Sequence, residues 1–464
     1  MEGSAAATGF YSVPPDPVGD VGPNHYVQMV NTAFAIFDKN GNLLAGPTAI
    51  NQLWQGQGNP CETCNDGDPI VLYDPLADRW LLSQFAVSTG PPYYECIAIS
   101  QTPDPTGAYY LYAFQIPTDF PDYPKLAVWP DAYYMSTNEN SPPVGVYAFD
   151  RSNMLEGQPA TYQKFQEQRN FMLPSDLDGS TPPPAGSPNY FYTMMDDTYW
   201  PSEGFPGEDR LEIWAFHVDF DTPANTSFTK MNELTSMDFN YLICEMGDFD
   251  CIPQKDVLQR LDAIAEWPMW RFQYRNFEEY ETLVGNFTVD VGDFTGHAGI
   301  LWFELRKTEG TSWSIHQYGT YSPDQEHRWM GSIAMNGDGD IALGYSVSSS
   351  TLHPSIRYTV RRRFDPLGLL IDDEMEVVTS PTSQAYANRW GDYSAMSVDP
   401  ADDTTFWYIN EYLSETGRWK TRITAFKLRS FFEEDDDFGC FISTVTGRHP
   451  MEPSVQVFPR ADEE

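Results

Sequence analysis

The chain is poor in basic residues and lacks the sequence patterns of several protein classes. It has 27 Lys and Arg against 67 Asp and Glu, which gives a formal net charge of −40. A surface of this sign repels polyanions, so recognition of nucleic acids or anionic membranes through overall charge is excluded. No stretch approaches the roughly 20 apolar residues of a membrane-spanning helix. The GxSxG, GxGxxG and P-loop patterns are missing as well.

Cysteine is scarce, with six residues in 464. Cys61 and Cys64 have CxxC spacing, but no second CxxC or His pair completes a zinc site. Cys244 and Cys251 flank a short acidic loop and could close a local disulfide. Cys96 lies in a predicted strand and could pair with Cys61 or Cys64. We therefore expect structural disulfides in an exported protein, not redox chemistry.

Aromatic residues, glycine and proline are abundant, and they fall into a recurring pattern. Aromatics make up 15% of the chain, which also has 33 Gly and 37 Pro. Asn388–Pro400 followed by Thr405–Tyr412 is typical of a strand, an Asp-Pro turn and a second strand. Similar turns near Pro75, Pro130 and Pro188 recur at intervals of about 55 to 58 residues. A degenerate repeat of short strands predicts an all-β propeller of about seven blades, each with four antiparallel strands.

The repeat also predicts the domain organisation. Residues 16–430 form a single propeller domain, preceded by a flexible segment at 1–15 and followed by an acidic tail at 431–464. The repeat fades at about 230–285, where we expect a small, partly helical insertion. Lys255–Glu266 has apolar residues at the spacing of a short amphipathic helix. We expect the N-terminal segment to add a strand to the last blade, because a closed ring leaves no free sheet edge.

Four phrases resemble a family of exported bacterial and environmental proteins of uncharacterised activity. The phrases are Asp68–Asp74, His327–Ser332, Pro354–Thr359 and Asn388–Pro400. This resemblance implies a β-propeller and, together with the cysteines, a secreted or cell-surface location, although Met1–Ser4 has no leader-peptide pattern. It implies no particular activity.

A weaker likeness links one turn to sialidase-type propellers. It rests on Asn336–Ser346. The sialidase Asp-box needs a Ser before its Asp and a Trp after it, whereas here Ser332 stands at a different spacing and the Trp is missing.

Propellers bind ligands where loops from several blades meet at one end of the central channel. An Arg that neutralises a uronate carboxylate, with a Tyr or His that moves the proton, would perform polysaccharide lyase chemistry. A carboxylate pair such as Glu304 and Asp392 would instead hydrolyse a glycosidic bond. The candidate catalytic residues are His297, His327, Arg328, Arg357, Arg389, Asp392 and Tyr393. The candidate ligand-binding residues are Glu304, Arg306, Tyr358 and Trp390.

Each of these residues also has a structural interpretation. Arg328, Arg357 and Arg389 could join blades through bidentate bonds to Asp or to carbonyl groups. His297 could cap a strand, and Trp390 could belong to the core and not to a sugar platform.

Calcium is the possible cofactor. Asn336, Asp338 and Asp340 alternate like the oxygen ligands of a calcium loop, but the downstream Glu of an EF-hand is missing. Asp176 and Asp178 form a similar acidic group, and ordinary solvated turns would explain both.

The sequence thus predicts an exported propeller that binds an extracellular polysaccharide, either neutral or acidic, at its channel mouth. Lyase or glycoside hydrolase chemistry would be carried out there. The alternative is a non-catalytic surface, adhesion or structural propeller stabilised by calcium.

Overall fold

The computed structural model describes residues 12–116, 119–139, 143–198, 208–244, 250–292, 296–428 and 456–457. The described residues form 28 strands and four short helices. The helices are η1 (Ile50–Trp54), α2 (Pro60–Thr63), α3 (Arg151–Leu155) and η3 (Pro223–Asn225). Among the described residues, no helix is long and apolar enough to cross a membrane.

The strands follow one another in sets of four, which we number as blades 1 to 7. Blades 1 and 2 contain β1 (Val18–Val21), β2 (His25–Val30), β3 (Ala33–Asp38), β4 (Leu43–Ala49), β5 (Gly67–Asp74), β6 (Arg79–Ala86), β7 (Tyr93–Ser100) and β8 (Tyr109–Ile116). Blades 3 and 4 contain β9 (Asp122–Val128), β10 (Tyr133–Asn138), β11 (Val144–Phe149), β12 (Tyr162–Glu167), β13 (Leu173–Leu177), β14 (Asn189–Met195), β15 (Arg210–His217) and β16 (Ser227–Leu234).

The remaining strands complete the series. Blades 5 and 6 contain β17 (Pro268–Asn276), β18 (Glu281–Asp290), β19 (Ala298–Lys307), β20 (Ser314–Tyr321), β21 (His327–Met335), β22 (Ile341–Ser348), β23 (Ser355–Arg361) and β24 (Met375–Thr379). Blade 7 contains β25 (Ala395–Val398), β26 (Phe406–Leu413), β27 (Trp419–Phe426) and β28 (Gln456–Val457).

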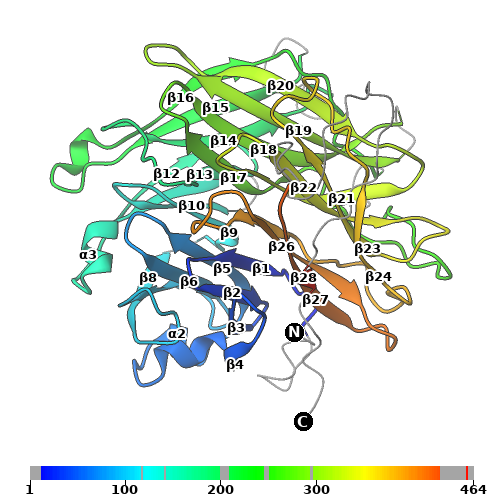
Figure 1. The fold of residues 1–464 in the computed structure, drawn as a ribbon. Helices are drawn as coiled ribbons and strands as arrows, with labels where there is room; N and C mark the ends of the chain where they lie inside the picture. Colours follow the sequence, from blue (N-terminus) through cyan, green and yellow to red (C-terminus); the bar gives the residue numbers. More distant parts are fainter. Residues whose placement is uncertain are drawn as a thin grey trace, which may run out of the picture.

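The first strand of each blade lies innermost, and these strands form a ring (Figure 1). β1, β5, β9, β13, β17, β21 and β25 each contact the next, and β25 contacts β1. Within each blade, neighbouring strands pair in antiparallel register. β13 and β17 also pair with each other, in parallel, so blades 4 and 5 share one eight-stranded sheet. The predicted all-β propeller of four-stranded antiparallel blades is confirmed.

Aromatic side chains fill the space between blades. Trp129 contacts Tyr274 edge-to-face with ring centroids 4.7 Å apart, and Tyr192 lies 4.4 Å from Phe272. These pairs join blade 3 to blade 5 and blade 4 to blade 5. Because each buried aromatic ring removes a large apolar surface from water, these contacts stabilise the packing of blades against one another.

Side chains also fill the channel, because they link innermost strands that are not neighbours in the ring. Trp270 on β17 is buried and donates its Nε1–H to the carbonyl of Leu126 on β9, at 3.5 Å. The adjacent Arg271 lies 3.8 Å from Asp20 on β1 and is hydrogen-bonded to Asp176. The centre of the ring is therefore packed.

Side-chain contacts between blades 1 and 7 close the ring. The rings of Tyr26 and Trp407 stack at 5.2 Å, and Lys39 Nζ lies 2.6 Å from Asp399 Oδ1. The outermost strand of blade 7 is β28, which pairs with Thr424 and Ala425 of β27. The expectation that the N-terminal segment supplies a strand to this blade is wrong, because the C-terminal part of the chain supplies it.

The expected insertion is shorter than predicted and contains no helix among its described residues. β16 ends at residue 234, and β17 and β18 already lie inside the predicted range 230–285. The helix expected over Lys255–Glu266 is wrong. Leu258 is fully exposed there, whereas Leu261 and Ile264 pack in non-helical backbone, with a φ of 42° at Ile264, against a core cluster that includes Trp329. Contacts with blades 6 and 7 thus override the helical spacing.

Both expected disulfides are present. Cys96 pairs with Cys61, and Cys244 pairs with Cys251. Cys64 keeps a buried thiol that accepts a hydrogen bond from the hydroxyl of Ser88. Cys440, the N-terminal residues 1–11 and the acidic tail, apart from 456–457, lie outside the described residues.

Removing the Cys61–Cys96 disulfide should lower the free energy of unfolding more than removing Cys244–Cys251. The first joins residues 35 apart and the second residues 7 apart, so the first constrains the unfolded chain more. We expect the C61A/C96A variant to lose about 1 kcal/mol more than the C244A/C251A variant in urea unfolding. Equal losses would contradict this prediction.

Candidate functional site

A cavity of about 560 Å³ lies where the chain enters several innermost strands. We call this cavity the channel mouth. Its size falls in the range of small-molecule sites, about 300–1,000 Å³. It is lined by Pro14, Asp16, Asn31, Asp68, Asp122, Asn170, Phe171, Met194, Met195, Tyr241, Asp262, Ile264, Glu266, Trp267, Arg389 and Asp392. The lining thus combines a set of carboxylates with a set of aromatic and thioether side chains.

The backbone has the same left-handed conformation at four places where the chain leads into an innermost strand. Asp16 (φ 46°), Asp68 (φ 47°), Tyr123 (φ 54°) and Phe171 (φ 45°) all have positive φ. Such conformations cost of order 1–3 kcal/mol each for a residue other than glycine, and they cluster at functional sites. A proline follows each of the first three. Pro17 directly precedes β1, and Pro69 and Pro124 are the third residues of β5 and β9.

A chain of hydrogen bonds links four blades across the mouth. Asp16 Oδ1 accepts the amide N–H of Asp392 at 2.7 Å, and its Oδ2 accepts Asn31 Nδ2–H at 2.6 Å. Asn31 Oδ1 accepts the amide of Asp68 at 2.8 Å, and Asp68 Oδ2 accepts the amide of Tyr123 at 3.2 Å. The orientation of these carboxyl groups is therefore fixed by the backbone of neighbouring blades.

Two cations accompany the carboxylates. Arg389 Nη2 donates to both oxygens of Asp392, at 2.5 and 2.7 Å. Lys125 is fully buried beneath the mouth, with Nζ 3.4 Å from the ring centre of Tyr123 and 3.9 Å from that of Tyr393. Burial lowers the pKa of Lys125 to about 8, and the nearby Asp68 opposes this shift.

Burial raises the pKa of several mouth carboxyls. It raises the pKa of Asp68 to about 7, although the charge of Lys125 acts in the opposite direction. It raises the pKa of Asp262 to about 7 as well, against the hydrogen bond from the amide of Ile264. The pKa of Asp392 is also raised by burial, and the guanidinium of Arg389 opposes that rise. Groups that titrate near neutral pH thus lie beside a carboxyl that is paired with arginine.

Of the predicted catalytic residues, Arg389 and Asp392 line the mouth. Tyr393 is buried behind it and donates its hydroxyl hydrogen to the carbonyl of Pro69 at 3.0 Å. Trp390 is buried and donates Nε1–H to the hydroxyl of Ser346 at 3.0 Å.

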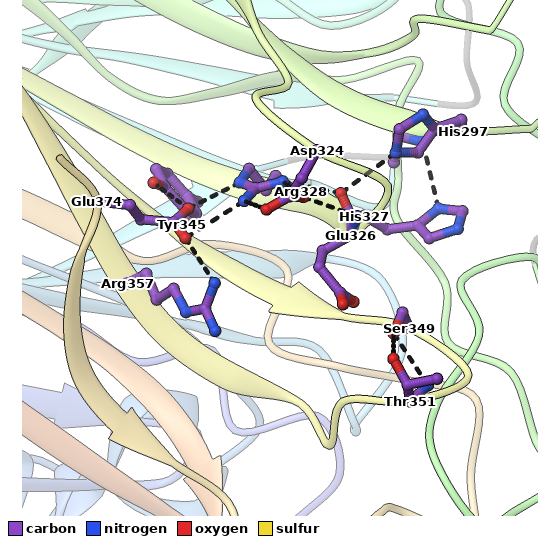
Figure 2. A network of polar contacts seen from close by, with 11 residues as sticks. His297, Asp324, Glu326, His327, Arg328, Tyr345, Ser349, Thr351, Arg357 and Glu374 are labelled. Atoms are coloured by element: carbon purple, nitrogen blue, oxygen red, sulfur yellow. Dashed lines mark hydrogen bonds and ion pairs between the residues drawn. The ribbon is translucent and has the colours of Figure 1, made fainter. Parts of the chain in front are cut away.

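Arg328 and Arg357 belong to a separate network that centres on Glu374 (Figure 2). Arg328 Nε lies 2.8 Å from Glu374 Oε1, and Arg328 Nη1 lies 2.8 Å from Asp324 Oδ1. Arg357 Nη1 contacts the other oxygen of Glu374 at 2.5 Å. This network joins elements of blade 6, and its arginines do not line the mouth.

The two predicted histidines lie next to each other, away from the mouth lining (Figure 2). The ring centroids of His297 and His327 are 5.0 Å apart. His327 Nδ1 accepts the amide of Ala298 at 3.3 Å, and burial lowers the pKa of His327 to about 4. His327 is thus a neutral ring at physiological pH, and it ties β19 to β21.

The predicted ligand-binding residues of blades 5 and 6 are engaged with their own or adjacent blades. Arg306 donates to Glu304, whose other oxygen accepts from Gln317. Tyr358 stacks on Phe426 at 3.8 Å. The structure therefore does not bring these three to the mouth.

The predicted metal residues have protein partners. Asn336 Oδ1 accepts the amides of Asp338 and Asp340, which closes the turn between β21 and β22. Asp176 and Asp178 face Arg271. Among the described residues, one other group of three carboxylates lies within 4.8 Å, namely Asp196, Asp197 and Asp209.

Most residues at and beside the channel mouth were not predicted from the sequence. The missed residues include Asp16, Asn31, Asp68, Asp122, Lys125, Asp262 and Glu266. The dipeptides Asp16-Pro17, Asp68-Pro69 and Tyr123-Pro124 each open an innermost strand, and their recurrence is a signal that could have located this end of the ring.

Removing Glu374 should destabilise the protein because Arg328 is completely buried and would lose a charge partner. We expect E374A to lose about 3 kcal/mol of unfolding free energy. E376A, at an exposed residue of β24 close to Glu374, is the matched control and should change little. Urea unfolding measures both, and equal losses would contradict the assignment.

Asp68 and Asp262 should make the protein less stable as pH rises from about 4 to about 7. Their folded pKa of about 7 exceeds the ordinary value of 3.8, so in this window the folded state binds more protons than the unfolded chain. The free energy of unfolding then falls with rising pH. The D68N/D262N variant should have a shallower slope in urea unfolding, and the exposed control D221N should keep the original slope.

No family model and no curated protein sequence matches the chain. Similar solved structures include an α-L-arabinofuranosidase from Lactobacillus brevis, with 9% identity, a TM-score of 0.33 and coverage of 78% of this chain and 91% of that one. An exo-β-1,3-galactanase from Clostridium thermocellum has 11% identity, a TM-score of 0.31 and coverage of 90% and 81%. The WD40 domain of SCAP from fission yeast has 7% identity, a TM-score of 0.35 and coverage of 89% and 84%. Identities and TM-scores this low say nothing about the activity of this chain.

Proposed function

We propose that the channel mouth binds the end of an extracellular polysaccharide and hydrolyses a glycosidic bond. The observation that supports this proposal is a cavity of about 560 Å³ that combines carboxyl groups with an aromatic surface. Glycoside hydrolysis needs two carboxyl groups in different protonation states, and sugar rings pack well against aromatic faces.

The two carboxyl groups would be Asp68 and Asp392. Asp68 has a pKa of about 7 because it is buried, so about half of it is protonated at neutral pH, and this form can give its proton to the leaving oxygen. Asp392 is held by two hydrogen bonds from Arg389, which favour its ionised form. Its carboxylate would act as base or nucleophile at the anomeric carbon.

The apolar side of the mouth would hold the sugar ring. Trp267 stacks on Phe171 with ring centroids 3.9 Å apart and meets Tyr123 edge-to-face at 4.3 Å. This aromatic group fixes the partly exposed Trp267 in one orientation beside the carboxyl groups. A preformed platform of this kind reduces the entropy lost on binding.

The geometry favours hydrolysis over the lyase reaction on an acidic polysaccharide. The carboxylates of the mouth would repel a uronate, and Arg389 is already paired with Asp392. Tyr393, which a lyase would use as its proton carrier, is buried with its hydroxyl bound to Pro69. The disulfides fit an extracellular location for this reaction.

A panel of neutral oligosaccharides, followed by release of reducing ends, tests this proposal. D68N and D392N should each lower kcat by at least about 100-fold while the ligand still stabilises the protein in a thermal-shift assay. Activity should fall as pH rises above about 7, because Asp68 then loses its proton. D221N should match the unmodified protein. Binding without cleavage would leave a non-catalytic propeller, and the absence of both would overturn the proposal.

A further inference from the structure

The channel mouth has far more negative than positive groups. Six carboxyl groups line it, namely Asp16, Asp68, Asp122, Asp262, Glu266 and Asp392. The one cationic side chain in the lining is Arg389, and both of the hydrogen bonds that its Nη2 makes go to Asp392. No described Lys, Arg or His nitrogen lies within 4.0 Å of the carboxyl oxygens of the other five.

Elsewhere several buried carboxylates are neutralised by a nearby cation. Asp74 pairs with Arg151 at 2.7 Å, and Glu139 pairs with Lys164 at 2.7 Å. Glu212 is likewise paired, with Arg169 at 2.9 Å. In each case the carboxylate side chain is fully buried, and Arg151 of α3, Lys164 of β12 or Arg169 before β13 supplies the opposite charge. Within the described parts of the chain, the mouth carboxyl groups other than Asp392 have no such ion pair, and the same is true of the buried Glu95 and Glu411.

Lys125 does not supply that partner. Its ammonium lies between the rings of Tyr123 and Tyr393, donates to the carbonyl of Pro124 at 3.1 Å and has no exposed surface. It is also not part of the cavity lining. A positive charge on a ligand in the cavity would favour the ionised forms of the mouth carboxyl groups, which burial disfavours by raising their pKa.

We propose that this charge is a protonated amine, and that the ligand is a glycan whose terminal residue is an amino sugar with a free amine. The inference rests on the proposed function, because it names the substrate class of the same cavity. An ammonium offers three donors to the carboxyl groups, and the faces of Trp267 and Phe171 also attract a cation. An N-acetylated residue has no such charge, and a uronate has the opposite one.

The arrangement of the carboxyl groups favours an amine over a single metal ion. Among the described residues, the three-carboxylate group that closes to within 4.8 Å is Asp196, Asp197 and Asp209, outside the mouth lining. Carboxyl groups spread around a cavity fit a ligand with several separate donors better than one ion that needs its ligands at about 2.3–2.6 Å.

Calorimetry with three matched tetrasaccharides tests this inference, using the full chain at about pH 7, where a sugar amine is partly protonated and Asp68 and Asp262, each with a pKa of about 7, are about half ionised. The probes are β-1,4-linked glucosamine, N-acetylglucosamine and glucose. We expect the glucosamine tetramer to bind at least about tenfold more tightly than either of the others. Its affinity should fall as salt is added, since the attraction is electrostatic. D122N should reduce the preference, and D221N should keep it.

The outcomes separate this inference from the proposed function. Equal affinities for the three tetramers would overturn the inference while leaving hydrolysis of a neutral glycan in place. Binding of calcium chloride alone, without any preference for the amine, would also overturn it and would assign the mouth to a metal. If none of the tetramers binds or is cleaved, and the neutral panel is likewise inactive, both proposals fall. Preferential binding without cleavage would support the inference and contradict the catalytic assignment.

Discussion

A ring of sheets holds together only if its last blade packs against its first, and this closure determines the rest of the structure. Here it depends on side chains from opposite ends of the chain, such as Tyr26 stacked on Trp407 and Lys39 paired with Asp399. The same seam reaches the functional end of the ring, where the amide of Asp392 donates to Asp16. The contacts that close the ring therefore also help to build the mouth.

The mouth works against stability in a way that the blades do not. Blades place several buried carboxylates beside arginine or lysine, as at Asp74 with Arg151. At the mouth, Asp68 and Asp262 are buried without such a partner, and burial raises the pKa of both to about 7. Proteins commonly keep destabilised groups of this kind where ligands bind, because a ligand can satisfy them. The extensive aromatic packing between blades offsets this cost.

The sequence shows the repeating strand units, but it does not show which residues of different blades meet at the mouth. Strand-turn-strand units and the cysteine positions predicted the propeller and its two disulfides, because both signals are local. The mouth is built from single residues contributed by several blades, so spacing along the chain could not show that Asp16 and Asp392 meet. Arg328 and Arg357 looked equally suited to a ligand, but Glu374 pairs with both of them. Lys255–Glu266 had helical spacing, yet its apolar residues pack against blades 6 and 7 in irregular backbone without forming a helix.

The packed centre of the ring limits how a ligand can move through the molecule. Trp270 bonds to Leu126 across the channel, and Arg271 reaches Asp20 just below it. The mouth is therefore a cup and not a tunnel. A polymer therefore cannot pass through the ring, and any chain that enters the mouth has to leave by the same face.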